Sequence, residues 1–142
     1  MKKKKETRQI TVFVGVCIKK DKILICQRFE PECPDAHLKW ELPGGKCDFG
    51  ETPKEALKRE FLEETGIEIK VERLIPFVHT HYWEYDWGIQ QTLVMSCECT
   101  YVRKITKPHD HKIREVKWIS IKELKNYELL IGTREILENL TS

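Results

Sequence analysis

The chain has 142 residues, of which 40% are hydrophobic and 34% are charged, and its formal net charge is +2. This length and balance are typical of one globular domain, and they exclude fibrous and intrinsically disordered proteins. The lysines at positions 2–5 supply the positive excess. Without them the formal charge is −2, so the body of the chain lacks the basic bias of proteins that bind nucleic acid polymers.

The basic run at residues 2–5 is followed by no apolar stretch, so it lacks the pattern of a secretory signal. We expect residues 1–7 to form a flexible tail and residues 8–142 a single domain, in a cytoplasmic protein without a membrane segment. The six cysteines contain no C-x-x-C pair and should stay reduced there. Cys97 and Cys99 could join the histidines at 79–81 and 109–111 in a zinc site, although strand alternation explains the same spacings without a metal.

The first part of the chain has the pattern of a buried hairpin. Residues 10–18 are apolar on both alternating faces, which indicates a strand covered on two sides and therefore helices on both faces of the sheet. A polar turn at 19–22 leads into a second strand at 23–28. Residues 29–39 contain two prolines and no periodicity, which predicts a loop before an extended segment at 40–42.

The next element is a helix with clear ends. Thr52, Pro53 and Glu55 form a capping box with proline at the first helical position, and Gly66 supplies the stop, so the helix should span residues 53–65. Alternation then predicts strands at 67–78, 89–102 and 115–119. A second capping box at Ser120 and Glu123 precedes a last helix at 134–140. This order predicts an α/β fold of the α+β type, with a mixed β-sheet between helices.

Three glutamates on the first helix are the candidate ligands for a cation. Glu60, Glu63 and Glu64 stand at i, i+3 and i+4, so their carboxylates share one helix face, where they repel each other. Oxygen ligands of this kind suit a hard cation such as Mg²⁺, which shares its coordination with waters and substrate phosphates. An acidic helix face is by itself more often only solvated, so the flanking residues decide between the two interpretations.

Those flanking residues form a longer pattern. The pattern begins with the extended run Trp40-Glu41-Leu42-Pro43-Gly44-Gly45. Five residues separate Gly45 from Glu51, and seven residues separate Glu51 from the run Arg59-Glu60-Phe61-Leu62-Glu63-Glu64-Thr65-Gly66-Ile67. This pattern resembles the Nudix box in full, with Phe61 where the family usually has an aliphatic residue. The resemblance covers most of the chain and is strongest to the MutT-like group of Nudix hydrolases. It implies a Nudix-type α/β/α sandwich.

The resemblance also implies roles for individual residues. It makes Glu60, Glu63, Glu64 and the Gly44 carbonyl the ligands of Mg²⁺, for which Mn²⁺ can substitute. Glu60 is our first choice of general base and Glu64 the second, with Asp110 and Glu115 as candidates outside the box. Arg28 would touch substrate phosphate, or it is an ordinary surface arginine. Gly45, Glu51 and Arg59 would support the site, with Arg59 paired to Glu51.

The implied activity is hydrolysis of a phosphoanhydride bond in a small nucleotide substrate. A nucleoside triphosphate converted to monophosphate and pyrophosphate is the leading reaction. A dinucleoside polyphosphate, ADP-ribose or a nucleotide sugar is the alternative substrate, and a noncatalytic nucleotide-sensing domain is the alternative from another class. The aromatic segment Tyr82–Trp87, at an expected hairpin tip, could stack on a base, pack within the hairpin or form an oligomer contact. The sequence leaves the oligomeric state open.

Overall fold

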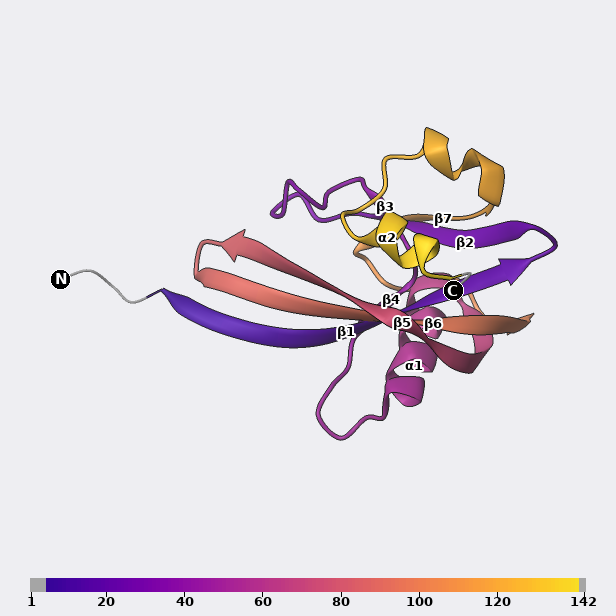
Figure 1. The fold of residues 1–142 in the computed structure, drawn as a ribbon, viewed down its shortest axis with the longest axis horizontal. Coiled ribbons are helices and arrows are strands. Elements are labelled where there is room, and N and C mark those ends of the chain that lie inside the picture. Colours follow the sequence, from indigo (N-terminus) through magenta and orange to yellow (C-terminus); the bar gives the residue numbers. More distant parts are fainter. Residues whose placement is uncertain (1–4, 141–142) are drawn as a thin grey trace.

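One mixed sheet of seven strands organises the protein in the computed structural model, which describes residues 5–140 (Figure 1). The strand order is β3-β2-β1-β6-β5, with β4 paired to β1 and β7 paired to β2. Strands β1 and β6 are parallel, whereas the other pairs are antiparallel. The elements in chain order are β1 Glu6–Lys19, β2 Lys22–Arg28, β3 Trp40–Glu41, β4 Gly44–Lys46, α1 Pro53–Thr65, β5 Ile67–Tyr85, β6 Gly88–Lys104, β7 Ile113–Ser120, the 3₁₀ helix η1 Ile121–Asn126 and α2 Thr133–Glu138.

Strand β1 has a buried face on each side of the sheet, as its sequence predicted. Phe13 and Cys17 pack in a core cluster with Leu57 and Phe61 from α1. Val16, on the other face, belongs to a second cluster that includes Ile136 of α2 and Trp40. Figure 1 shows the two helices on opposite sides of the strands β1, β6 and β5. The α/β/α arrangement with a mixed sheet between helices is therefore confirmed.

Helix α1 has the predicted bounds because both of its ends are capped. The Thr52 hydroxyl accepts a hydrogen bond from the Glu55 backbone N–H at 3.2 Å, and the Glu55 carboxylate accepts one from the Thr52 N–H at 3.4 Å. Gly66 ends the helix with φ of 75°, and a methyl group there would lie 1.9 Å from the Thr106 carbonyl oxygen. Glycine is thus required at the point where β5 begins.

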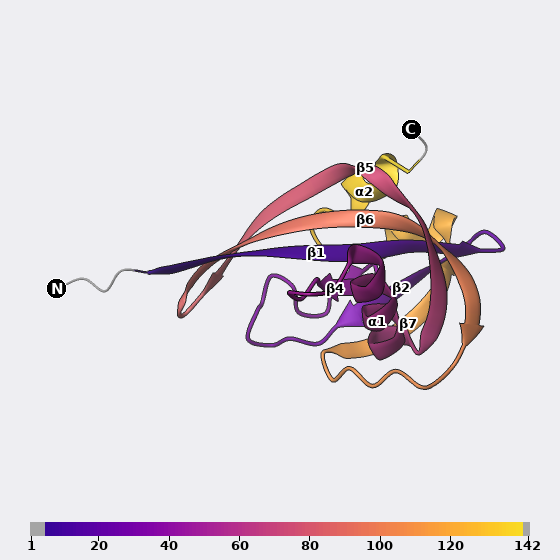
Figure 2. The same ribbon diagram turned by 90° about the horizontal axis from the view of Figure 1, so that it is seen from below.

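Three strands extend beyond the body of the molecule as an arm. It consists of the first half of β1, the end of β5 and the start of β6 (Figures 1 and 2). Parallel pairing aligns Glu6 with Gly88, and antiparallel pairing aligns Tyr85 with Gly88 at the tip of the β5–β6 hairpin. The segment Tyr82–Trp87 lies at this hairpin tip, where the sequence placed it.

The structure corrects several expected boundaries. Strand β1 starts at Glu6, so residues 6 and 7 are paired strand rather than tail, because β6 offers them a partner edge; residues 1–4 lie outside the described range. Strand β5 runs unbroken to Tyr85 through register shifts. The last helix is Thr133–Glu138, and the Ser120 side chain makes no cap hydrogen bond to the 3₁₀ helix that follows, so the second capping box is wrong. None of the helices within residues 5–140 is long and apolar enough to cross a bilayer.

The packing of α1 generates a stability prediction. Phe61 is completely buried between α1 and the sheet, so Phe61→Ala should lower the free energy of unfolding by about 3–5 kcal/mol through lost burial and a cavity. Phe49 lies fully exposed in the loop before α1, so Phe49→Ala should change it by less than about 0.5 kcal/mol. Urea unfolding of both variants measures the difference. Equal losses would contradict this account of the core.

Candidate active site

The Gly44-Gly45 segment brings strand β4 against helix α1. Strand β4 is held by β1, where Val14 pairs with Gly44 and Phe13 with Gly45. The Gly44 N–H donates a hydrogen bond to Glu64 Oε1 at 2.8 Å. A methyl group on Gly45 would lie 2.4 Å from Cδ of Glu60, so the missing side chain makes room for that carboxylate. Both glutamates are thereby placed against the backbone of β4.

A third carboxylate joins them from a distant part of the chain. Oxygen atoms of Glu60, Glu64 and Asp110 all lie within 4.8 Å of one another. Asp110 belongs to the connection between β6 and β7, and its Oδ1 accepts a hydrogen bond from the Lys112 N–H at 2.9 Å. The same connection is fixed to the end of α1, because the His109 N–H donates to the Glu63 carbonyl oxygen at 3.0 Å. We call Glu60, Glu64 and Asp110 the carboxylate cluster.

Burial makes the negative charge in this cluster costly. Glu64 is only 6% exposed, and desolvation, followed by the nearby charge of Glu41, raises its pKa well above the usual range despite the hydrogen bond from Gly44. Desolvation also raises the pKa of Glu60, and the adjacent Arg59 opposes that shift. Crowded, desolvated carboxylate oxygens are more stable when they bind a proton or a hard cation than when their negative charge is uncompensated. The carboxylate cluster can therefore hold a divalent cation.

Arg59 braces the loop before α1 against the helix. Its Nε and Nη2 donate to the two carboxylate oxygens of Glu51 at 2.7 and 2.8 Å, and its Nη1 donates to Glu60 Oε1 at 2.9 Å. These hydrogen bonds lower the pKa of Glu51 to about 2. Glu63 also faces Arg59, at 3.4 Å, and the structure leaves it outside the carboxylate cluster. Its ligand role stays a prediction.

Arg28 lies on the wall of the same cavity but already has acidic partners. Its Nε and Nη2 donate to Glu41 at 2.9–3.2 Å, and its Nη1 donates to Glu30 at 3.0 Å. Both glutamates are buried. No sequence signal pointed to these two partners, because Glu41 lies 13 residues from Arg28 and no local spacing links the two. Glu115 is exposed and pairs with Lys117, away from the cavity.

The cavity beside the carboxylate cluster has a volume of about 390 Å³. Its walls come from the body of the molecule, the inner face of the arm, the loop at 29–39 and the segment at 130–136. Trp83 and Tyr85 of the aromatic segment line it, whereas Tyr82 is 60% exposed on the opposite face of β5. Cys97 and Cys99 are buried in the core, and the carboxylate cluster is the one group of three or more potential ligands within residues 5–140, so the structure lends no support to the zinc alternative.

The family model of the NUDIX domain matches residues 7–140. The chain belongs to the Nudix family. Part of the chain is also similar to proteins named as 8-oxo-dGTP diphosphatases. The chain is 43% identical over 58 residues to a protein of Mycobacterium tuberculosis named putative 8-oxo-dGTP diphosphatase 2, covering 41% of this chain and 40% of that protein. It is 53% identical over 45 residues to the 8-oxo-dGTP diphosphatase of Haemophilus influenzae, covering 32% of each chain.

Solved structures share the Nudix fold over nearly the whole chain. A MutT Nudix hydrolase from Burkholderia pseudomallei superposes with a TM-score of 0.71 at 24% identity, covering 94% of this chain and 98% of that one. A Nudix hydrolase from Nitrosomonas europaea gives 0.72 at 20% identity, covering 94% and 89%. The aligned segments with the curated relatives of M. tuberculosis and H. influenzae, by contrast, span less than half of those proteins.

The buried carboxylates predict how a metal changes stability with pH. The raised pKa of Glu64 stabilises the metal-free fold below about pH 4.3, the ordinary glutamate value, and that contribution is lost as pH rises through the folded-state pKa. A divalent cation competes with the proton for the same oxygens. The rise in Tm on replacing EDTA with Mg²⁺ or Mn²⁺ should therefore be larger at about pH 8 than at about pH 5.

The matched control for this prediction is Glu64→Gln, which keeps the side-chain size and removes the titrating group. It should flatten the pH dependence of the metal-induced change in Tm. Glu51 adds no pH dependence to the Tm between the two pH values of this test, because its lowered pKa places its protonation at more acidic pH. A metal-induced change that is the same at both pH values would count against the cluster as the binding site.

Proposed function

We propose that this Nudix hydrolase uses Mg²⁺, replaceable by Mn²⁺, to hydrolyse a phosphoanhydride bond in a small nucleoside diphosphate-linked substrate. The leading reaction converts a nucleoside triphosphate, or its deoxy form, to the monophosphate and pyrophosphate. The observation that carries the proposal is the carboxylate cluster, packed against Gly44-Gly45 at a cavity large enough for a small ligand. The names of the relatives in M. tuberculosis and H. influenzae support this substrate class.

The residues present fit a divalent cation. One carboxylate oxygen of Glu64 accepts the hydrogen bond from the Gly44 N–H, and the remaining lone pairs of this desolvated carboxylate can bind a cation. Glu60 and Asp110 add further oxygen atoms, and the three carboxylates lie within 4.8 Å of one another. The proposed ligands are Glu60, Glu64 and, from the family resemblance, Glu63 and the Gly44 carbonyl. Asp110 is a further candidate that the geometry adds. When bound, Mg²⁺ neutralises charge on the phosphate oxygens and orients the water that attacks phosphorus.

The chain's own side chains have three tasks in this reaction. Glu60, or else Glu64 or Asp110, takes the proton from the attacking water, and burial raises the pKa of both glutamates, which makes each a stronger proton acceptor than an ordinary carboxylate. Arg59 holds Glu60 in place while it binds Glu51. Arg28 has one Nη1 N–H with no acceptor within residues 5–140, which is available to a phosphate oxygen.

Measurements of turnover on different nucleotides distinguish the alternative functions. A dinucleoside polyphosphate, ADP-ribose or a nucleotide sugar would use the same cluster on a different scissile bond. A noncatalytic nucleotide sensor is less well supported, since every box carboxylate is present and three carboxylates converge on one point. We further propose that the chain acts as one domain, that the protein works in the cytoplasm, and that its partner is the nucleotide rather than a nucleic acid polymer or a membrane.

The first test of the function is turnover with and without metal. Purified protein should release pyrophosphate or phosphate from at least one nucleotide in the presence of Mg²⁺ or Mn²⁺, and chelation should abolish the reaction, because only oxygen ligands converge on the site. A screen of nucleoside triphosphates, ADP-ribose, dinucleoside polyphosphates and nucleotide sugars, ranked by kcat/KM, identifies the substrate class. Undiminished turnover in excess EDTA would refute the proposed chemistry.

The second test compares two substitutions of the same kind. Glu64→Gln keeps an oxygen for the Gly44 N–H and removes the charge, so kcat should fall about 10²-fold or more. Glu68→Gln changes a glutamate of β5 that pairs with Arg103 at the surface, and kcat should stay near the wild-type value. Both variants should fold, with Tm as the check. If Glu64→Gln turned over substrate at the wild-type rate with unchanged Mg²⁺ affinity, the assignment of the box glutamates to the catalytic site would be wrong.

A further inference from the structure

The arm has an outer face, opposite the cavity, that the proposed chemistry does not use. Side chains alternate along a strand, so the residues next to the cavity-lining ones of β1, β5 and β6 point to this face. Strand pairing arranges them in rows with one residue from each strand. From the body to the tip, the rows are Phe13, Met95 and Val78; Thr11, Leu93 and Thr80; Gln9, Gln91 and Tyr82; and Thr7, Ile89 and Glu84. None of these residues, which we call the outer face, lines the cavity.

Helix α1 covers only the body end of the outer face. Phe13 is buried in the core cluster with residues of α1, and Met95 packs against that cluster. Toward the tip, Leu93 and Ile89 are half-buried and Tyr82 is 60% exposed. Figure 2 shows α1 in front of the body of the sheet and the arm extending past it. Beside the first turn of α1, the helical layer therefore stops while the sheet continues.

The composition of the outer face is that of a protein interface. Charged residues make up 34% of the chain, but Glu84 is the one charged residue of the outer face. Side-chain hydrogen bonds join one row, since Gln9 Nε2 donates to Gln91 Oε1 at 2.8 Å and Gln91 Nε2 donates to the Tyr82 hydroxyl at 3.2 Å. Depletion of charge, with tyrosine and methionine present, distinguishes the core of an interface from the rest of a protein surface. A protein chain therefore suits this face better than a charged ligand does.

Opposite charges stand at the two ends of the outer face. Glu84 lies at the tip, and Lys54 lies in the first turn of α1 at the body end. Burial raises the pKa of the Cys97 thiol and the charge of Lys54 opposes that rise, so Lys54 is close to Cys97, which follows Met95 on the same side of β6. Neither Glu84 nor Lys54 makes an ion pair within residues 5–140. Each is therefore available to a charge on another chain.

We propose that the outer face binds the same face of a second copy of this chain, in an antiparallel dimer with Leu93 of both copies at the two-fold axis. Leu93 stands midway along β6 between Ile89, which pairs with Glu84, and Cys97, which lies near Lys54. A two-fold axis at Leu93 therefore places Glu84 of one copy against Lys54 of the other, and does so at both ends of the interface. The face is thus complementary in charge to itself, which is the argument for a second copy over a different protein.

The space beside α1 also fits the arm of a second copy. Stacked sheets lie about 10 Å apart, close to the diameter of a helix, so the second arm would continue the layer that α1 begins. The outer face measures about 20 Å along the strands and about 14 Å across them. Two such faces bury roughly 1,000 Å² in total, which is the lower limit for a specific interface. We therefore expect a reversible dimer with a Kd of about 1–100 µM.

The first test is the mass of the full chain in solution. In sedimentation equilibrium between about 1 µM and about 1 mM, the weight-average mass should rise from 16.9 kDa toward twice that value. Leu93→Glu places two carboxylates against each other at the axis, so the Kd should rise at least about tenfold. Tm confirms that the variant is folded. A wild-type protein that stays at 16.9 kDa at about 1 mM would overturn the inference.

Charge reversals test the partner and its orientation. Glu84→Lys alone and Lys54→Glu alone each bring like charges together at both ends of the dimer, so the Kd of each variant should rise about tenfold. A mixture of the two variants restores an opposite-charge contact at both ends, and it should form a mixed dimer with the wild-type Kd. These exposed positions keep the test valid if Leu93→Glu does not fold.

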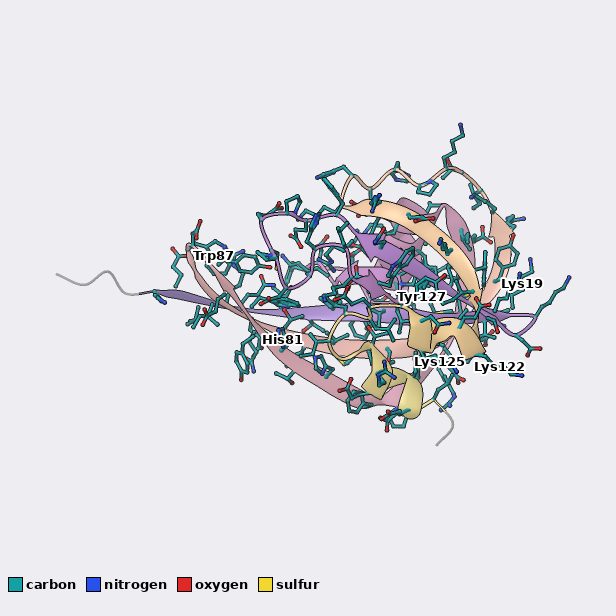
Figure 3. All side chains as sticks on the ribbon, turned by 90° about the horizontal axis from the view of Figure 1, so that it is seen from above. Lys19, His81, Trp87, Lys122, Lys125 and Tyr127 are labelled. Atoms are coloured by element: carbon teal, nitrogen blue, oxygen red, sulfur yellow. The ribbon has the colours of Figure 1, made fainter. Side chains whose placement is uncertain are left out.

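Lys122→Glu is the matched control, because it reverses an exposed lysine of η1. Figure 3 shows Lys122 at the opposite end of the molecule from Trp87, which lies at the tip of the arm. This variant should dimerise with the wild-type Kd. A dimer that is insensitive to Leu93→Glu, or a mixture of the two charge variants that associates no better than either alone, would show that the outer face is not the interface.

Discussion

The hydrogen bond from the Gly44 N–H to the Glu64 carboxylate joins strand β4 to helix α1 and sets the distance between them. It can form only because the two glycines allow close approach. A methyl group on Gly44 would collide with the Phe13 carbonyl oxygen at 2.1 Å, and one on Gly45 would collide with Glu60. Since β4 is paired to the central strand β1, this contact fixes helix α1 relative to the middle of the sheet. Both the carboxylate cluster and the cavity beside it depend on this contact.

Two arginine systems stabilise the acidic region from opposite sides. Arg59 pairs with Glu51 and touches Glu60, while Arg28 pairs with Glu41 and, together with Lys112, with Glu30. Glu64 lies between them with no cationic side-chain partner within residues 5–140. Glu64 is therefore a buried carboxylate without a compensating cation, whereas the nearby Glu60 and Glu41 each contact an arginine. The buried charge of Glu64 lowers the stability of the metal-free protein, and a bound divalent cation would offset that cost.

The parts of the fold that sequence could predict were those fixed by local signals. Helix α1 was predicted with its bounds, because Thr52, Glu55 and Gly66 act within a few residues of it, and the alternation in β1 indicated helices on both sides. The sequence could name Asp110 only as one of two acidic candidates, since its position depends on a connection fixed to α1 by a contact to the Glu63 carbonyl. The Arg28–Glu41 pair and the course of the arm likewise depend on strand pairing between distant segments, which no local pattern encodes.

The parallel pairing of β1 with β6 also bears on how the chain folds as it is made. Each pair joins residues 82 positions apart, so the strand at the centre of the sheet emerges from the ribosome long before its partner. Helix α1 and both glycines are synthesised in that interval, with no complete sheet to pack against. Contacts of such sequence separation close late and slow folding, because loop closure comes before any gain from pairing. A nascent β1, apolar on both faces, would meanwhile be a natural substrate for chaperones that shield hydrophobic strands.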